Sequence, residues 1–376
     1  MSLALSPDYA AVTSEVKSYS RIGKILDIPH LIQVQLQSFE WLMGDGLLEV
    51  FQEVSPIQDF TANKFELYFD DHAFRDPKYT PDECKDKEIT YSASLWIKTR
   101  LVTKETGVIK EQEIFMGDMP MMTENGTFIV NGAERVVVSQ LVRSPGAYFV
   151  LDRDIASDRN LCSAKLVPYR GAWLEFETST KNILSVKVDR KRKVSVTTFL
   201  RALGLADDDE ILSLFDDVDT DPSRKYIRTT LDKDVDPDDK ESHFRSDDLK
   251  AVWQWLCPDR EYQPDKAKKI ANAQLEFYRR LRPGEPPSLE NAYSLLRNLL
   301  FEPRRYDLGR VGRHKLNSRL NMDKPLETRV LDREDLIALI RTMIQLNNGE
   351  GRPDDIDHLG NRRGRAVGEG EIESAA

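Results

Sequence analysis

The sequence is poor in the residue types that build covalently linked or metal-stabilised folds. Among its 376 residues are three widely separated cysteines, Cys84, Cys162 and Cys257, and five scattered histidines. A disulfide framework or a structural zinc site needs paired or closely spaced ligands, so we expect neither. Free thiols fit a reducing compartment. We therefore expect a cytoplasmic protein with no metal site and no cofactor of its own.

Long apolar runs are also missing. No stretch approaches the about 18 consecutive apolar residues that a membrane-spanning helix needs. The first residues, Met1–Val16, lack a basic segment followed by an apolar one, so we expect no secretory signal. The sequence therefore predicts no membrane partner.

Motifs of self-contained enzymes are not found. There is no phosphate-binding loop of the Walker type, and no HExxH, GxSxG or GxGxxG motif. The acidic run Asp354–His358 (DDIDH) could be imagined as a metal cluster, but no second acidic loop matches it. An acidic loop facing arginines is the preferred interpretation. The sequence thus predicts no catalytic residue.

The charge of the chain is negative but unevenly distributed. With 54 basic and 64 acidic residues the formal net charge is −10, which would speak against nucleic acid as a partner. Acidic residues dominate between Asp207 and Asp248, whereas Asp189–Lys193, Arg310–Lys315 and Asn361–Arg365 are locally basic. An acidic segment can mask a basic face, so the net charge does not exclude nucleic acid.

The length suggests two or three domains, and the amino-terminal part alternates between helical and strand patterns. Apolar residues at helical spacing predict a helix over Ile28–Met43 that ends at Gly44. The runs Lys64–Phe69 and Tyr91–Val102 have the composition of strands.

The stretch Met122–Gly146 predicts a hairpin that leads into a cationic turn. Asn125-Gly126 suits a tight turn, Phe128–Val130 a buried strand, and Val136–Val138 a second extended segment. Proline and glycine then end regular structure at Arg143–Gly146. Taken alone, the stretch could be core or the approach to a functional surface, and the core interpretation is favoured.

The carboxy-terminal part predicts a meander followed by helices. Alternating apolar residues within Ala164–Val188 indicate short antiparallel strands. The acidic segment 206–248 is the best candidate for a mobile insertion. Helical patterns follow at Asp247–Leu256 and Asp265–Leu281, and Ser288 and Asp332 are expected to cap two more helices. The predicted class is α+β, with two mixed lobes that each combine antiparallel strands and packed helices.

Several collinear segments resemble the β subunit of bacterial RNA polymerase, specifically its amino-terminal third. The resemblance extends from about Tyr19 to Glu369 and includes VPYRGAWLEF, DRKRK and DDIDHLGNRRGRAVGE. Its segments are Ile109–Gly146, Val167–Phe176, Asp189–Lys193, Leu281–Asn317 and Asp354–Glu369.

This resemblance implies a division of the chain. It predicts a protrusion at 19–142, a lobe at 143–351 and a segment at 352–376 that returns to the protrusion. The preceding residues 1–18 lack strong periodicity and are expected to be a flexible segment. Residues 206–248 are an acidic variable insertion within the lobe. The sequence departs from the family after Glu369, where the last residues (GEIESAA) are expected to be a truncated tail.

The resemblance also implies a DNA-binding site. This part of the β subunit forms one side of the downstream DNA cleft and binds bases of the non-template strand. An indole stacks on an unpaired base, and a carboxylate accepts hydrogen bonds from the ring N–H and amino group of guanine. Without the resemblance, the tryptophan would be assigned to the core and the Asp357–Arg362 pair to a salt bridge within one loop. The matching residues are Arg143, Trp173, Asp189, Arg190, Ile356, Asp357 and Arg362.

A second implied site is for protein partners. Ile109, Lys110 and Glu111 match the edge strand to which CarD-type regulators and the transcription-repair coupling factor attach. A sigma factor and the other polymerase subunits are further implied partners. The magnesium ions of nucleotidyl transfer belong to another subunit, so the chain is expected to be non-catalytic alone. The alternative is a regulator-binding module without DNA affinity in isolation.

Overall fold

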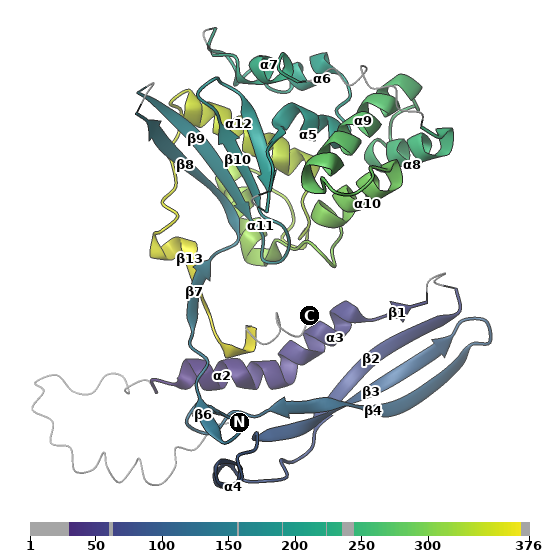
Figure 1. Cartoon of the computed structure of the whole chain (residues 1–376), viewed down its shortest axis with the longest axis vertical. Helices are drawn as coiled ribbons and strands as arrows, with labels where there is room; N and C mark the ends of the chain where they lie inside the picture. Colours follow the sequence, from purple (N-terminus) through teal and green to yellow (C-terminus); the bar gives the residue numbers. More distant parts are fainter. Residues whose placement is uncertain are drawn as a thin grey trace, which may run out of the picture. The chain divides into compact units, whose positions relative to one another are not determined.

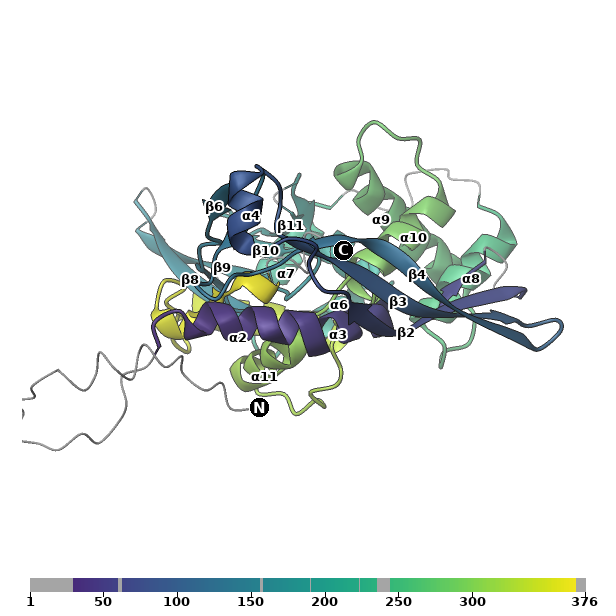
Figure 2. The same ribbon diagram turned by 90° about the horizontal axis from the view of Figure 1, so that it is seen from below.

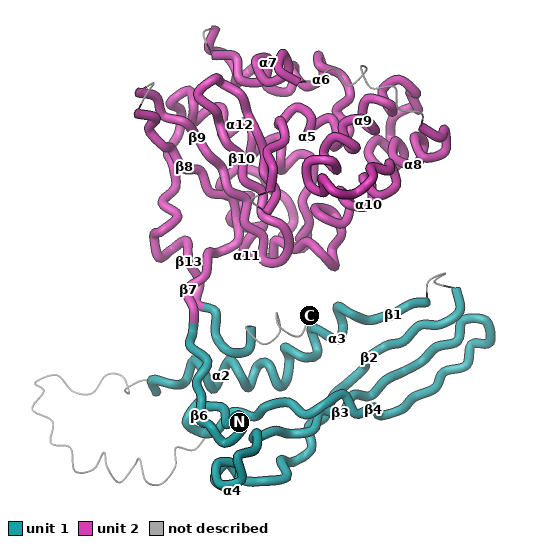
Figure 3. Tube along the Cα trace, in the orientation of Figure 1, with its two compact units in different colours: residues 1–139, 365–376 teal, residues 140–364 magenta. Residues whose placement is uncertain are grey.

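The computed structural model describes residues 30–59, 63–155, 158–189, 191–222, 224–234 and 244–369. The chain forms two compact units: unit 1 is Met1–Ser139 with Arg365–Ala376, and unit 2 is Gln140–Gly364 (Figure 3). Both units combine helices with antiparallel strands, which confirms the predicted α+β class. Within the described ranges, no helix is long and apolar enough to cross a membrane.

Unit 1 is built on a four-stranded antiparallel sheet with the strand order β1-β2-β3-β4 (Figure 1). The two predicted strands are confirmed within β2 and β3, and both extend beyond their predicted ends. β4 lies at an edge of the sheet, so one side of its backbone is not used by β3. The strands are β1 (Ile57–Gln58), β2 (Phe65–Phe74), β3 (Ser92–Thr103) and β4 (Val108–Pro120).

A helical rod accompanies this sheet. It consists of α2 (Gln33–Trp41), a π-helical turn (Leu42–Gly46) and α3 (Leu47–Val54), which follow one another in Figure 2. The predicted end at Gly44 is therefore wrong, and the first two residues of the predicted helix lie outside the described part. Gly44 is exposed with no atom near its missing side chain, whereas the neighbouring Leu42 is buried, so packing carries the helix past the glycine. A short helix, α4 (Pro81–Asp86), begins at a capping box of Thr80 and Glu83.

The predicted hairpin exists, but its tight turn is elsewhere. β5 (Phe128–Val130) pairs with β6 (Ala133–Arg135) through the two-residue turn Asn131-Gly132. Both turn residues have positive φ angles, 51° and 78°, as a type I′ turn requires. Asn125-Gly126 instead lies in the wider turn before β5.

The predicted second extended segment, Val136–Val138, is not a strand, and its three side chains are 56%, 39% and 72% exposed. The predicted core role therefore holds for Phe128 and Ile129, which are buried, and is wrong for the valines. A β-branched run favours extended backbone but gains little stability without a neighbouring strand, and the described residues provide none here.

Unit 2 contains a five-stranded antiparallel sheet with the order β12-β11-β10-β9-β8. The meander predicted within Ala164–Val188 is confirmed, because Leu174 of β10 pairs with both Val188 and Leu166 of the adjacent strands. Burial alternates along β10 and β11, as expected for a sheet covered on one face. The strands are β8 (Gly146–Asp154), β9 (Arg159–Val167), β10 (Leu174–Thr178), β11 (Leu184–Val188) and β12 (Val194–Ser195).

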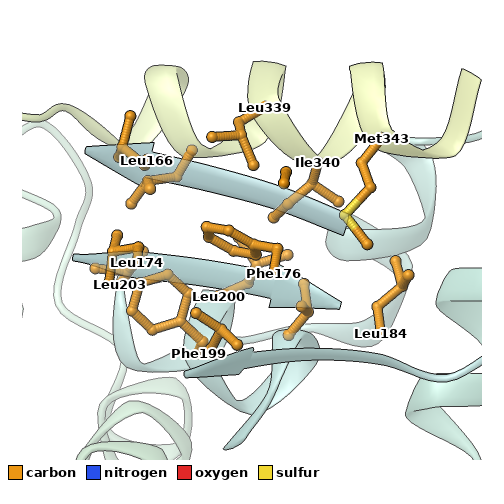
Figure 4. Close-up of a cluster of buried hydrophobic side chains, with 14 of the residues drawn as sticks. Leu166, Leu174, Phe176, Leu184, Phe199, Leu200, Leu203, Leu339, Ile340 and Met343 are labelled. Carbon is orange, nitrogen blue, oxygen red and sulfur yellow. The ribbon is translucent and has the colours of Figure 1, made fainter. Parts of the chain in front are cut away.

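Helices cover the apolar face of this sheet. Leu339, Ile340 and Met343 of α12 meet Phe176 of the sheet (Figure 4), and Phe199 of α5 packs edge-on against Phe176. The predicted caps are confirmed: Ser288 accepts a hydrogen bond from the backbone N–H of Asn291, and Asp332 forms a capping box. The longer helices are α5 (Val196–Ala202), α8 (Ser246–Leu256), α9 (Pro264–Leu281), α10 (Leu289–Leu300), α11 (Gly309–Leu320) and α12 (Arg333–Asn347).

The acidic segment is partly folded into this core. It forms α6 (Asp208–Ser213) and α7 (Tyr226–Leu231), and its Ile211, Phe215 and Tyr226 are buried with the sheet residues. The prediction of a mobile insertion is therefore wrong for the described residues up to 234. The segment contains few apolar residues among its acidic ones, but these few pack into the core and hold the two short helices in place. Residues 235–243 lie outside the described part.

Candidate nucleic-acid interface

Two distant segments of the predicted DNA site meet at a pair of short strands. β7 (Gln140–Arg143) pairs with β13 (Arg362–Arg365) to form a separate two-stranded sheet. Directly after β7, the backbone N–H of Ser144 donates to the carbonyl of Asn361 at 3.0 Å. This pairing places Arg143 and Arg362, which are more than two hundred positions apart in the sequence, on neighbouring strands.

Trp173 joins the same site from the turn that precedes β10. The guanidinium carbon of Arg143 lies 5.8 Å from the centre of the Trp173 ring, within the range of a cation–π contact. Trp173 is partly exposed, while its neighbours Ala172 and Leu174 are buried. The simple assignment of this tryptophan to the core therefore does not hold. Its ring is held by a buried strand end and is partly accessible to solvent.

Asp189 fixes the backbone of this tryptophan. The backbone N–H of Trp173 donates to Asp189 Oδ1 at 2.8 Å, and the backbone N–H of Asp189 donates to the Trp173 carbonyl at 3.0 Å. Asp189 has a φ angle of 46°, a left-handed conformation that aspartate tolerates better than most residues. Its role in the structure is to position Trp173. Arg190, the next residue of the predicted site, lies outside the described residues.

Asp357 and Arg362 form an ion pair at the surface. The Asp357 Oδ1 atom lies 2.6 Å from an Arg362 Nη atom, and the aspartate side chain is 79% exposed. The pair is thus the salt bridge within one loop that the residue types suggest by themselves. An exposed pair of this kind contributes at most about 1 kcal/mol, so a ligand can open it at little cost. Ile356 is partly exposed in the same loop.

The loop that carries this pair is firmly attached to unit 2. Asp354 accepts hydrogen bonds from the Phe149 backbone N–H and from Arg319, both at 2.9 Å. Lys315 donates to the Gly360 carbonyl at 3.1 Å, and partial burial lowers the pKa of its ammonium group. The acidic loop does face basic side chains, as preferred from the sequence. Across the described residues, no group of three His, Cys, Asp or Glu side chains could hold a metal ion.

Other basic residues near this site differ in exposure. Arg304, Arg305 and Arg310 are exposed, whereas Arg313 is fully buried in an ion pair with Asp335. Lys315 and Arg319 contact the acidic loop, although the sequence alone does not single them out. Their only signal is the basic run Arg310–Lys315, which ends at Lys315 and precedes Arg319, and that run does not reveal which side chains turn inward.

The predicted partner site lies on unit 1. Ile109, Lys110 and Glu111 are exposed residues of the edge strand β4, where they pair with Val102, Leu101 and Arg100 of β3. The exposed apolar residues of the same strand are Val108, Ile109, Ile114, Phe115 and Met116. Within the described residues, no further strand pairs with the outer side of β4.

The larger part of the chain matches a known protein family. Residues 143–365, which contain the whole predicted DNA site, match the family model "RNA polymerase Rpb2, domain 2". The match covers more than half of the sequence. The chain therefore belongs to the RNA polymerase Rpb2 family.

The particular relatives are bacterial. A protein of Dehalococcoides mccartyi named DNA-directed RNA polymerase subunit beta is 45% identical over 371 residues, which cover 98% of this chain and 27% of the relative. The protein of the same name from Chloroflexus aggregans is 48% identical over 384 residues, covering 94% of this chain and 29% of the relative. These matches confirm the resemblance to bacterial β subunits. The chain spans little more than a quarter of the length of these relatives.

Proposed function

We propose that this chain acts in transcription as part of a DNA-directed RNA polymerase, in which unit 2 forms one side of the downstream DNA cleft and binds unpaired bases of the non-template strand. The observation that carries the proposal is the convergence of an aromatic ring, a guanidinium and an exposed carboxylate on the β7–β13 pair. Arg143 lies over Trp173, and Arg362 on the adjacent strand binds Asp357.

The chemistry of these groups favours a separated DNA strand. With Arg143 over the Trp173 ring, the indole offers a platform for stacking an unpaired base. The Asp357 carboxylate can accept from the ring N–H and amino group of guanine, donors that are hidden by base pairing in a duplex. Arg362, released from Asp357, is then placed to bind phosphate. These groups thus supply contacts for the bases and for the backbone of an open strand.

We expect Trp173→Leu to weaken binding of a guanine-bearing single strand by about 5- to 150-fold, because stacking on an aromatic ring contributes about 1–3 kcal/mol per base. Asp357→Asn should remove the preference for guanine and leave binding to other bases nearly unchanged. Fluorescence anisotropy with single-stranded and bubble DNA at low salt measures both effects. A matched control is Asp158→Asn, since Asp158 is an exposed aspartate paired with Arg153 at the other end of the β8–β9 hairpin.

The assignment of the site would be lost if neither Trp173→Leu nor Asp357→Asn changed affinity for a guanine-bearing strand, in the chain alone or in reconstituted polymerase. We further propose that the chain alone does not catalyse nucleotidyl transfer, and that the magnesium ions of that reaction are bound by another subunit. Nucleotide incorporation by the purified chain would contradict this.

A second candidate function is a docking module for transcription regulators, with no DNA affinity in isolation. The exposed edge strand β4 favours it, because an unpaired edge can take up a strand from a partner. The edge carries an apolar residue, Ile109, followed by two charged residues, Lys110 and Glu111. We propose a CarD-type regulator or the transcription-repair coupling factor as the partner at this edge, with sigma factor and the other polymerase subunits bound elsewhere.

Charge reversal at the edge strand tests the docking site. Glu111→Lys should weaken binding of a CarD-type barrel domain by about tenfold or more, because a mismatched charge is brought into the interface. Glu105→Lys is the control, since Glu105 is an exposed residue of the turn between β3 and β4 and makes the same charge change outside the strand. Isothermal titration calorimetry gives the two affinities. Equal affinities for Glu111→Lys and the unaltered chain would move the interface elsewhere.

A further inference from the structure

The turn that carries Trp173 carries a second exposed aromatic residue. Tyr169 follows the buried end of β9 and is 39% exposed, although Pro168 and Ala172 beside it are buried. The guanidinium carbon of Arg363 lies 4.9 Å from the centre of the Tyr169 ring. Tyr169 and Arg363 therefore repeat the arrangement of Trp173 and Arg143.

The Trp173–Arg143 and Tyr169–Arg363 pairs are formed by the same turn and the same two strands. Both rings belong to the five-residue turn from Tyr169 to Trp173, and both arginines belong to the paired strands β7 and β13. Arg143 ends one strand and Arg363 lies next to Arg362 on the other. Two aromatic–arginine pairs are thus built on one five-residue turn and one pair of strands in unit 2.

The backbone at Tyr169 is rigid. The backbone N–H groups of Tyr169 and Arg170 both donate to the Asp307 carbonyl, at 2.8 and 3.0 Å, and the Asp307 N–H donates back to Arg170. Gly171 has a φ angle of 116°, and a side chain there would come within 2.9 Å of the Arg305 carbonyl. The turn is therefore fixed against the segment 305–307. A rigid backbone that exposes a large aromatic ring has the features of a stacking platform.

We propose that Tyr169 and Arg363 form a second nucleotide subsite, which binds the unpaired nucleotide adjacent to the one at Trp173, whatever its base. The tyrosine ring stacks on the base, and the guanidinium of Arg363 binds the phosphate. A guanidinium that lies over a ring keeps its N–H donors in its own plane, where they can reach a phosphate. Stacking does not distinguish bases, since each has a π face, so this subsite contributes affinity without sequence preference. The inference rests on the proposed binding of a single strand by unit 2.

Scanning with abasic sites tests this subsite. Single-stranded oligonucleotides, each with one abasic position, should reveal two adjacent positions at which loss of the base weakens binding to the unaltered chain. Tyr169→Leu should weaken binding to the intact strand by about 5- to 150-fold and abolish the sensitivity at one of these positions. Trp173→Leu should abolish it at the other. Tyr169→Phe retains the ring and should behave as the unaltered chain.

The salt dependence tests the arginine. Replacement of one phosphate-binding cation in a single-strand complex reduces the slope of log K against log salt concentration by about 0.7. We expect this reduction for Arg363→Gln and no change of slope for Tyr169→Leu. Arg153→Gln is the control, because Arg153 is an exposed, ion-paired arginine at the far end of β8. A purely structural role for Arg363 would lower thermal stability without changing the slope.

The possible results separate the two proposals. If Trp173→Leu alters the abasic scan and Tyr169→Leu gives the scan of the unaltered chain, the second subsite is refuted and the DNA site remains. If neither variant alters the scan, or if the chain binds no single strand at low salt, both are refuted. Loss of one sensitive position in Tyr169→Leu, with an unchanged thermal unfolding temperature, supports the subsite.

Discussion

Replacement of Asp335 by alanine is expected to lower the free energy of unfolding of unit 2 by about 3–5 kcal/mol, because it leaves a buried charge without its partner. Arg313 Nη1 lies 2.9 Å from both carboxylate oxygens of Asp335, and the exposed fractions of the two side chains are 0% and 1%. The remaining donors of Arg313 bind the carbonyls of Thr328 and Val330, both at 2.6 Å. The guanidinium therefore has no route to solvent when the aspartate is removed.

Urea unfolding followed by circular dichroism measures this effect. The matched control is Asp217→Ala, because Asp217 also pairs with an arginine, Arg341, but is 63% exposed, and its loss should cost less than about 1 kcal/mol. The double variant Arg313→Met, Asp335→Leu should recover part of the stability lost in Asp335→Ala, since apolar side chains of similar size can replace a buried ion pair, but the capping box of α12 is lost with Asp335. Equal destabilisation by Asp335→Ala and Asp217→Ala would contradict the prediction.

Phe176→Ala is the second substitution with a large expected effect, also about 3–5 kcal/mol in the free energy of unfolding. Phe176 is fully buried in the middle strand of the five-stranded sheet, and its ring centre lies 6.3 Å from that of Phe199. It meets residues of both α5 and α12 (Figure 4), so truncation leaves a cavity that neither helix can close alone.

The neighbouring residue of the same strand provides the control for this substitution. Glu175 points to the opposite face of the sheet, where it lies 4.0 Å from Lys165, and Glu175→Ala should cost much less than Phe176→Ala because it opens no large apolar cavity. Both variants place alanine at neighbouring positions of one strand, so the difference between them comes from the side chain that is removed. Similar unfolding curves for Phe176→Ala and Glu175→Ala would show that Phe176 is not central to the core.

The parts of the fold that the sequence predicts well are those with a strong local pattern. The alternation along β10 and β11, and the caps at Ser288 and Asp332, depend on residues a few positions apart. Predictions failed where tertiary packing decides. The valines of Val136–Val138 favour a strand, but no neighbouring strand pairs with them in the described residues. Gly44 does not end the helix, because burial of the nearby Leu42 stabilises the helical conformation across it.

The candidate site shows the same limit. Neither spacing nor composition places Arg143 beside Arg362, because their proximity comes from the pairing of β7 with β13. Only the resemblance to a known family indicated that Trp173 belongs with them. Burial of a charged residue is equally hard to predict. A basic run such as RVGRHK suggests a solvent-exposed surface, yet Arg313 within it is the largest fully buried side chain described. Charge alone does not show which member of a run finds an internal partner.

The pairing of β7 with β13 has a consequence for the architecture of the chain. These strands are the first and last elements of unit 2, so its 140–364 segment starts and ends at one place. Unit 2 is in this sense a domain inserted into unit 1, attached by two adjacent backbone connections. A domain with adjacent ends can gain or lose residues in its interior without changing the distance that its host must span.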